Sequence, residues 1–191
     1  MSVPSSRLHA AARQQGLSLI ELVIFMVVVS AALAGLLKVF VQATTYSADP
    51  MLRRQALAIA ESLMEEVQLM PFTWCDPDDA NADTATSPAG CASTVEALGP
   101  EAGETRFTTP QFDNVNDYNG HAMSGIVDIT NTAVPALGGY SAAVTVAPAA
   151  LGSIAAGSGD ALRITVNVTA PGGVSITLDG YRSRHAPNAG V

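Results

Sequence analysis

The sequence predicts an α+β fold in which a long N-terminal helix packs on an antiparallel β-sheet. Three observations lead to this prediction. An apolar segment near the N-terminus is long enough to cross a membrane as a helix. A helical segment with one apolar face follows it, and stretches of alternating apolar and polar residues lie beyond residue 139. A sheet with one apolar face needs a cover, which the amphipathic helix supplies.

Length and composition narrow the possible functions. The 191 residues suffice for one modest domain and an anchor, and the net charge of −8 provides no basic surface for nucleic acid. No phosphate-binding glycine-rich loop follows a predicted strand, and His121 and His185 have no recognisable nucleophile or metal-spaced partner in the sequence. We therefore expect no nucleic-acid partner, no cofactor, no metal and no enzymatic activity.

The N-terminal segment begins with a polar, basic leader at residues 1–16, which contains Arg7 and Arg13 but no acidic residue. Residues 17–37 follow, with Glu21 as their one charged residue and a length that matches a bilayer core. A carboxylate inside a bilayer costs a few kcal/mol, so its presence there calls for a function. The positive charges before the apolar segment place the N-terminus in the cytoplasm.

A conventional signal peptide is the alternative interpretation of this segment. Such a peptide would be cleaved after its apolar part, and residues 31–34 offer small side chains for that cleavage. The apolar sequence nevertheless continues through residues 35–37, and an acid such as Glu21 is unusual in a signal core. We therefore favour a retained helix.

Residues 17–70 are expected to form this long helix, membrane-spanning in its first half and amphipathic in its second. Pro50 is expected to kink or briefly break it, with Asp49 capping the restarted part. Pro71 is expected to end it. Apolar residues recur at steps of three and four along the second half and predict the face that covers the sheet: Leu52, Ala56, Ile59, Leu63, Val67 and Met70.

Residues 71–184 are predicted to form the globular domain, and residues 185–191 a C-terminal tail. Alternation with a period of two predicts strands with one buried face at residues 140–147, 162–169 and 174–179. The intervening Ala170-Pro171-Gly172-Gly173 predicts a hairpin between the last two. A further short strand is expected at residues 106–109.

Two cysteines, Cys75 and Cys91, lie in a polar loop after the helix. An exported domain meets an oxidising compartment, which favours a disulfide, and the alternative is a thiol pair for metal binding or redox chemistry. Between them, Asp79-x-Asn81-x-Asp83 resembles the start of a calcium loop, but the glycine and the terminal glutamate of an EF-hand are missing. We interpret this segment as a solvated acidic loop, with calcium binding as the weaker alternative.

A second polar segment, at residues 112–120, is rich in Asn, Asp and Gly and therefore predicts turns. We expect it to cross the sheet edge with Phe112, Val115 and Tyr118 directed inward. A glycan or partner site is the alternative, because loops often carry function.

The run Gly16-Leu17-Ser18-Leu19-Ile20-Glu21 behind a short basic leader resembles the prepilin signature of type IV pilins and type II secretion pseudopilins. The resemblance rests on spacing, charge and hydrophobicity together, although Leu17 stands where the family usually has Phe or Met. Residues 55–67 with Pro71-Phe72 resemble the helix end of minor pilins. Weaker similarities to the D-type minor pilins of mannose-sensitive haemagglutinin pili lie at residues 113–120, 139–140 and 179–182.

The resemblance implies a ladle-shaped pilin fold and a sequence of processing and assembly steps. Prepilin peptidase would cleave after Gly16 and methylate the amine of Leu17, and the protein would wait as a single-pass protein of the bacterial inner membrane. It would then enter a pilus at the cell surface, where Glu21 pairs with the N-terminal amine of a neighbouring subunit. The implied partners are prepilin peptidase, the inner-membrane assembly platform, membrane lipid, and other pilin subunits through the N-terminal helix.

The sequence thus favours a minor type IV pilin, a structural subunit that takes part in pilus biogenesis. A minor pseudopilin of a type II secretion system is the nearest alternative. A membrane-anchored adhesive binding module is the third, and Glu21 argues against it because a plain anchor gains nothing from this acid.

Overall fold

A computed structural model of the protein describes residues 18–184, and at residues 43–49 it describes the helical backbone but not the side chains. Gly16, Leu17 and the expected C-terminal tail at 185–191 lie outside the described residues. The chain divides into two compact units, Met1–Ser47 and Ala48–Val191. The first contains the apolar segment, and the second contains the sheet and its core.

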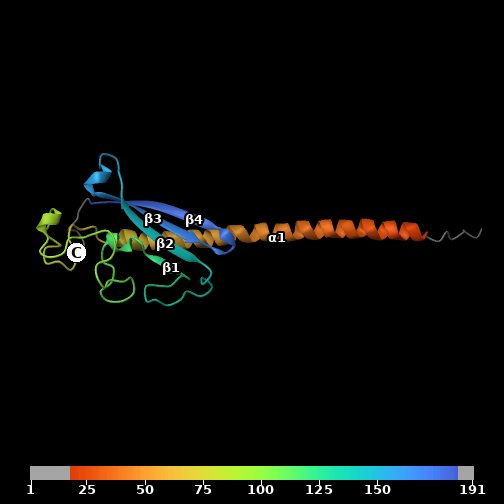
Figure 1. The fold of residues 1–191 in the computed structure, drawn as a ribbon, viewed down its shortest axis with the longest axis horizontal. Coiled ribbons are helices and arrows are strands. Elements are labelled where there is room, and N and C mark those ends of the chain that lie inside the picture. The colour runs from red at the N-terminus through yellow and green to blue at the C-terminus, as the bar shows by residue number, and fades with distance from the viewer. Residues whose placement is uncertain (1–17, 185–191) are drawn as a thin grey trace, which may run out of the picture. The chain divides into compact units, whose positions relative to one another are not determined.

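Helix α1 extends from Leu19 to Leu69 (Figure 1). Of the two outcomes expected at Pro50, a kink or a short break, the break is wrong, because helix α1 continues through this residue. A proline removes one backbone hydrogen bond, and the hydrogen bonds of the neighbouring turns can keep the segment helical. The helix was expected to end at Pro71, and its last residue is Leu69, two residues earlier.

Within the first unit, Leu19–Gln42 is long and apolar enough to cross a membrane, and none of this stretch is buried. Large apolar side chains remain exposed along it, including Phe25 and Phe40, which are 64% and 68% accessible. A surface of this kind is unfavourable in water and compatible with a membrane-spanning helix.

The second unit contains a four-stranded antiparallel sheet with the order β1-β2-β3-β4 (Figure 1). Three strands correspond to the predicted ones: β2 (Ser141–Pro148), β3 (Ala161–Thr169) and β4 (Ser175–Ser183). Strand β1 (Ala122–Ser124) was not predicted, because three residues are too few to show alternation. The register places Val144 opposite Val166, and Val166 opposite Leu178.

The strand expected at residues 106–109 is wrong. The backbone turns there instead, with the Thr105 hydroxyl accepting hydrogen bonds from the amides of Phe107 (3.3 Å) and Thr108 (2.9 Å). Threonine side chains can compete in this way with regular backbone pairing. The expected hairpin between β3 and β4 is present, with Gly172 and Gly173 both at positive φ and the three-ten turn η4 (Pro171–Gly173) between the strands.

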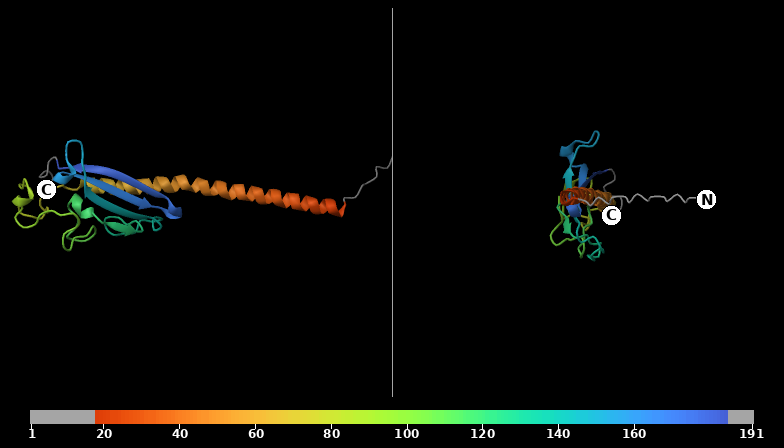
Figure 2. Two further views of the ribbon diagram at one scale, coloured as in Figure 1. Left: turned by 45° about the horizontal axis from the view of Figure 1, so that its top comes forward. Right: turned by 90° about the vertical axis from the view of Figure 1, so that its right-hand side faces the viewer.

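The core of the second unit lies between one face of the sheet and the C-terminal part of α1, and Figure 2 shows the strands alongside this part of the helix. The predicted apolar faces of β2 and β3 are buried, as are Ala56, Leu63 and Val67 of the helix. The helix approaches β4 closely at Gly180, where an added Cβ would lie 2.7 Å from the sulfur of Met64. The prediction that the helix covers the sheet is therefore confirmed.

Short three-ten turns complete the unit: η1 (Pro88–Gly90), η2 (Val115–Tyr118) and η3 (Ala156–Ser158). All four residues of η2 are buried, which confirms that Val115 and Tyr118 point inward. Asp117 stabilises its start, because its Oδ2 accepts the backbone N–H groups of Asp113 (2.9 Å) and Asn114 (2.7 Å).

Candidate functional sites

Glu21 lies in the first turn of α1, where its side chain is exposed. The first intrahelical bond there runs from the Leu22 amide to the Ser18 carbonyl (3.1 Å). The amides of a first turn carry partial positive charge, which favours a carboxylate at this position. The expected cleavage at Gly16 and methylation of Leu17 lie outside the described residues and stay predictions.

The disulfide loop contains the expected bond between Cys75 and Cys91. Cys75 is fully buried and packs with Ala82 and Ala85 in a small core separate from the main one. The loop therefore has a covalent link and a few apolar contacts, but little buried surface of its own.

Asp79 organises this loop. Its two carboxylate oxygens accept backbone N–H groups from Asn81, Ala92, Ser93 and Thr94 at 2.6–2.9 Å. These bonds, first among them those from Thr94 and Ala92, hold the pKa of Asp79 well below its usual range. The carboxylate thus fixes the conformation of the loop.

The other two residues of the calcium alternative have different surroundings. The Asn81 side chain donates to the Gly90 carbonyl (2.8 Å), and Asp83 is exposed. Among Asp79, Asn81 and Asp83, the best-defined role is therefore the hydrogen bonding of Asp79.

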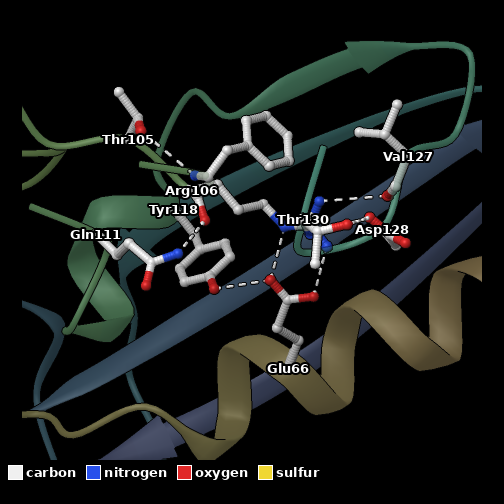
Figure 3. A network of polar contacts seen from close by, with 9 residues as sticks. Glu66, Thr105, Arg106, Gln111, Tyr118, Val127, Asp128 and Thr130 are labelled. Carbon is white, nitrogen blue, oxygen red and sulfur yellow. Dashed lines mark hydrogen bonds and ion pairs between the residues drawn. The ribbon is translucent and has the colours of Figure 1, made fainter. Parts of the chain in front are cut away.

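A largely buried ion pair connects α1 with the loop that follows the disulfide loop (Figure 3). Arg106 donates from Nε and Nη2 to the two oxygens of Glu66, each at 2.7 Å, and the Tyr118 hydroxyl donates to the same carboxylate at 2.8 Å. Burial opposes ionisation of Glu66, but Arg106 and Tyr118 outweigh it and lower the pKa of Glu66. The same carboxylate raises the pKa of Arg106.

Sequence reasoning did not identify this pair. The one available signal was the position of Glu66 beside the apolar helical face, three residues after Leu63. Next to the pair is a groove of about 520 Å³, whose lining includes Gln55, Ile59, Met123 and Leu137. Its lining is mainly apolar, with Glu66, Arg106 and Asp128 as charged groups.

Six carboxyl groups gather where the disulfide loop, the loop after it and η2 meet. They form two groups, and in each group one carboxylate oxygen per residue lies within 4.8 Å of the others: Asp76 with Glu104 and Asp113, and Glu96 with Glu101 and Asp117. Sequence reasoning did not find them, because the residues come from separate segments of the chain.

Five of these carboxyl groups, those of Asp76, Glu96, Glu104, Asp113 and Asp117, have raised pKa values. Burial, followed by the charge of Asp117, raises the pKa of Glu96 to about 9. Burial, followed by the charge of Asp76, raises the pKa of Asp113 to about 6. The pKa values of Glu104 and Asp117 are raised as well, first by burial and then by neighbouring carboxylates. Ionised together, these groups destabilise one another.

Arg184 connects the end of β4 with the segment after α1. Its guanidinium lies 3.7 Å from the ring centroid of Phe72 and 4.0 Å from that of Trp74, and it donates to the Thr73 carbonyl. Burial lowers the pKa of Arg184 to about 10, against the attraction of Asp160. The stacking attaches the strand to the segment that leads into the disulfide loop.

The chain was compared with known proteins at the level of family models, curated proteins and solved structures, and none of them matches it.

Proposed function

We propose that the protein is a minor type IV pilin, a structural subunit that takes part in pilus assembly. The observation that supports this most is the combination found in α1. An apolar stretch of 24 residues, Leu19–Gln42, has no part buried, and it carries an acid, Glu21, in its first turn.

A plain membrane anchor does not need that acid, because a carboxylate in lipid is unfavourable without a partner. In a filament of parallel helices, the N-terminal amine of one subunit can approach Glu21 of another. Two opposite charges held in an apolar core attract strongly, and neither can be left unpaired without a large loss of stability. The pair would therefore fix the axial stagger between subunits.

In this proposal, the protein is first held in the bacterial inner membrane with its N-terminus in the cytoplasm. Prepilin peptidase and the assembly platform act on it there, and the pilus at the cell surface is its destination. The disulfide between Cys75 and Cys91 supports an oxidising location for the second unit. A minor pseudopilin would share all these features and would differ in the machine that it joins.

The mature N-terminus tests the proposal. Mass spectrometry of the protein from membranes should find a chain that begins at Leu17 and carries an N-methyl group. Gly16→Leu should retain the leader, because the peptidase has to approach the backbone at this position, whereas Ser18→Ala should be processed normally. A mature chain that begins near residue 35 would show that a conventional signal peptide had been removed, and the pilin proposal would be wrong.

A further inference from the structure

The group formed by Glu96, Glu101 and Asp117 combines three acidic side chains from two segments, the loop after the disulfide loop and η2. Glu96 follows the short pairing of Cys75 with Val95, and its amide donates to the Trp74 carbonyl at 3.1 Å. Asp117 belongs to η2. Oxygens of the three carboxylates lie within 4.8 Å of one another, although like charges repel.

A second observation concerns hydrogen bonding. Asp117 is fully buried, and its Oδ1 has no hydrogen-bond partner, whereas its Oδ2 accepts the two amides at the start of η2. Both carboxylate oxygens of Glu96 and Oε2 of Glu101 are likewise buried and without a partner. Buried carboxylate oxygens are normally hydrogen-bonded or bound to a cation, because their desolvation is otherwise uncompensated.

We propose that Glu96, Glu101 and Asp117 bind a divalent cation, and that this cation is calcium. Calcium binds six to eight oxygen ligands in flexible geometry, and carboxylates are its usual protein ligands. Magnesium requires a near-ideal octahedron at shorter distances, which carboxylates from two separate segments are less suited to provide.

The neighbouring group of Asp76, Glu104 and Asp113 adds to the negative field at this site. Glu104 accepts the Glu101 amide at 3.2 Å, which places it directly beside the proposed ligands. Arg184 attracts Glu96, but its salt bridge is with Asp160 at 3.7 Å.

The backbone already holds the two segments together. The Gly99 amide donates to the Asn116 carbonyl at 3.0 Å, which joins the loop after Glu96 to η2. A bound cation would add a link between the base of the disulfide loop and η2. The carboxylates that repel one another without the cation would then all be attracted to it. The ligand binding would thereby stabilise the folded second unit.

Thermal unfolding of the full chain in detergent tests this proposal, with the fluorescence of Trp74, the single tryptophan, as the signal. After removal of metals with EDTA, calcium at about 5 mM should raise Tm by roughly 3–8 °C. This calcium concentration exceeds the dissociation constants common in extracellular calcium modules, so the site should be occupied in the folded protein. Magnesium at the same concentration should raise it clearly less.

Glu96→Gln should remove most of the calcium-dependent increase in Tm. In EDTA, the same variant should be about as stable as the wild type, because glutamine replaces the buried carboxyl group by a neutral amide of the same size, so a folding defect can be recognised. Asp83→Asn is the matched control, since Asp83 is an exposed acid of the disulfide loop, and it should keep the full calcium response.

Terbium luminescence supplies a second measurement. Terbium(III) resembles calcium in its preference for oxygen ligands, and excitation of Trp74 should sensitise it because the Trp74 backbone is hydrogen-bonded to that of Glu96. Calcium should displace the signal, and Glu96→Gln should reduce it at least about tenfold, which corresponds to the loss of one strong ligand interaction. An unchanged Tm with calcium, or a response lost in Asp83→Asn and kept in Glu96→Gln, would overturn the assignment.

Discussion

Arg106 and Glu66 are 40 residues apart in the sequence and form a two-pronged ion pair with both N–O distances at 2.7 Å. The side chain of Arg106 is only 6% exposed and that of Glu66 is 23% exposed. The pair attaches the loop after the disulfide to the C-terminal part of α1, at the edge of the groove. Because both charges are largely removed from water, each depends on the other.

Removal of one partner should therefore be more harmful than removal of both. Arg106→Met should lower the free energy of unfolding by about 3–5 kcal/mol, because it leaves a buried carboxylate without its counter-charge. The double variant Glu66→Met/Arg106→Met should recover part of this loss. The coupling is measured by chemical denaturation of the wild type, the two single variants and the double variant in a double-mutant cycle. Additive effects of the two substitutions would contradict a coupling between Glu66 and Arg106.

The same pair predicts a dependence of stability on pH. The folded-state pKa of Glu66 is lowered, since Arg106 and Tyr118 outweigh the effect of burial, while His121 adds a weaker attraction. The ionised Glu66 carboxylate therefore contributes its full stabilisation at pH values above the pKa of glutamate in the unfolded chain, about 4.3. This stabilisation is lost as the pH falls through the lower pKa that Glu66 has in the folded protein.

Arg106→Gln should raise the pKa of Glu66, because burial is then opposed by the Tyr118 hydrogen bond and His121 alone. Carbon NMR titration of the Glu66 carboxyl group measures this directly, with Glu66→Gln used to assign the resonance. Glu61→Gln is the control, as Glu61 is exposed on the opposite side of the helix, and it should leave the titration unchanged. An unchanged pKa in Arg106→Gln would show that the ion pair is not formed in solution.

The disulfide loop makes a separate prediction. Cys75→Ala/Cys91→Ala should lower the free energy of unfolding by about 3 kcal/mol on the chain-entropy model for a loop of this length. Asp79→Asn should speed proteolysis within the loop even when the disulfide is intact, because it weakens the charge-assisted bonds from Asn81, Ala92, Ser93 and Thr94.

Limited proteolysis followed by peptide mapping measures both effects, and Asp83→Asn is again the control. Cleavage of Asp79→Asn at the wild-type rate would mean that the disulfide alone determines the loop conformation.

The regular elements were predictable because each carries its own periodicity. Leu162, Ile164, Val166 and Val168 alternate with polar residues, and all four are buried in β3. The helical face from Leu52 to Met70 was equally clear, since residues three and four apart share one side of a helix. In both cases, the pattern that decides the structure lies within a single short segment.

The polar sites were not predictable, because each is assembled from distant segments. The partner of Glu66 lies 40 residues away, and Glu96 meets Asp117 only after the loop between them has folded back. The short break expected at Pro50 was wrong for another reason. Proline costs about 3 kcal/mol within a helix, but the other hydrogen bonds of this 51-residue helix keep the segment helical.

The last prediction concerns Glu21 and assembly. Glu21→Val should insert into the membrane at least as well as the wild type, because an apolar residue replaces one that is unfavourable in lipid. It should nevertheless enter filaments poorly, since the attraction between amine and carboxylate is about 4 kcal/mol at an effective dielectric constant of 20. The ratio of protein in sheared filaments to protein in membranes should fall at least about tenfold, which requires the loss of only 1.4 kcal/mol.

Ser30→Ala is the matched control in the same helix. The Ser30 hydroxyl donates to the Met26 carbonyl one turn before it, so its polar group is satisfied within the helix and its removal should leave assembly unchanged. Glu21→Asp should give an intermediate ratio, because the charge is kept while the reach of the side chain is shortened. If Glu21→Val enters filaments as efficiently as the wild type, Glu21 has no pairing role, and the membrane-anchored binding module becomes the better explanation of the chain.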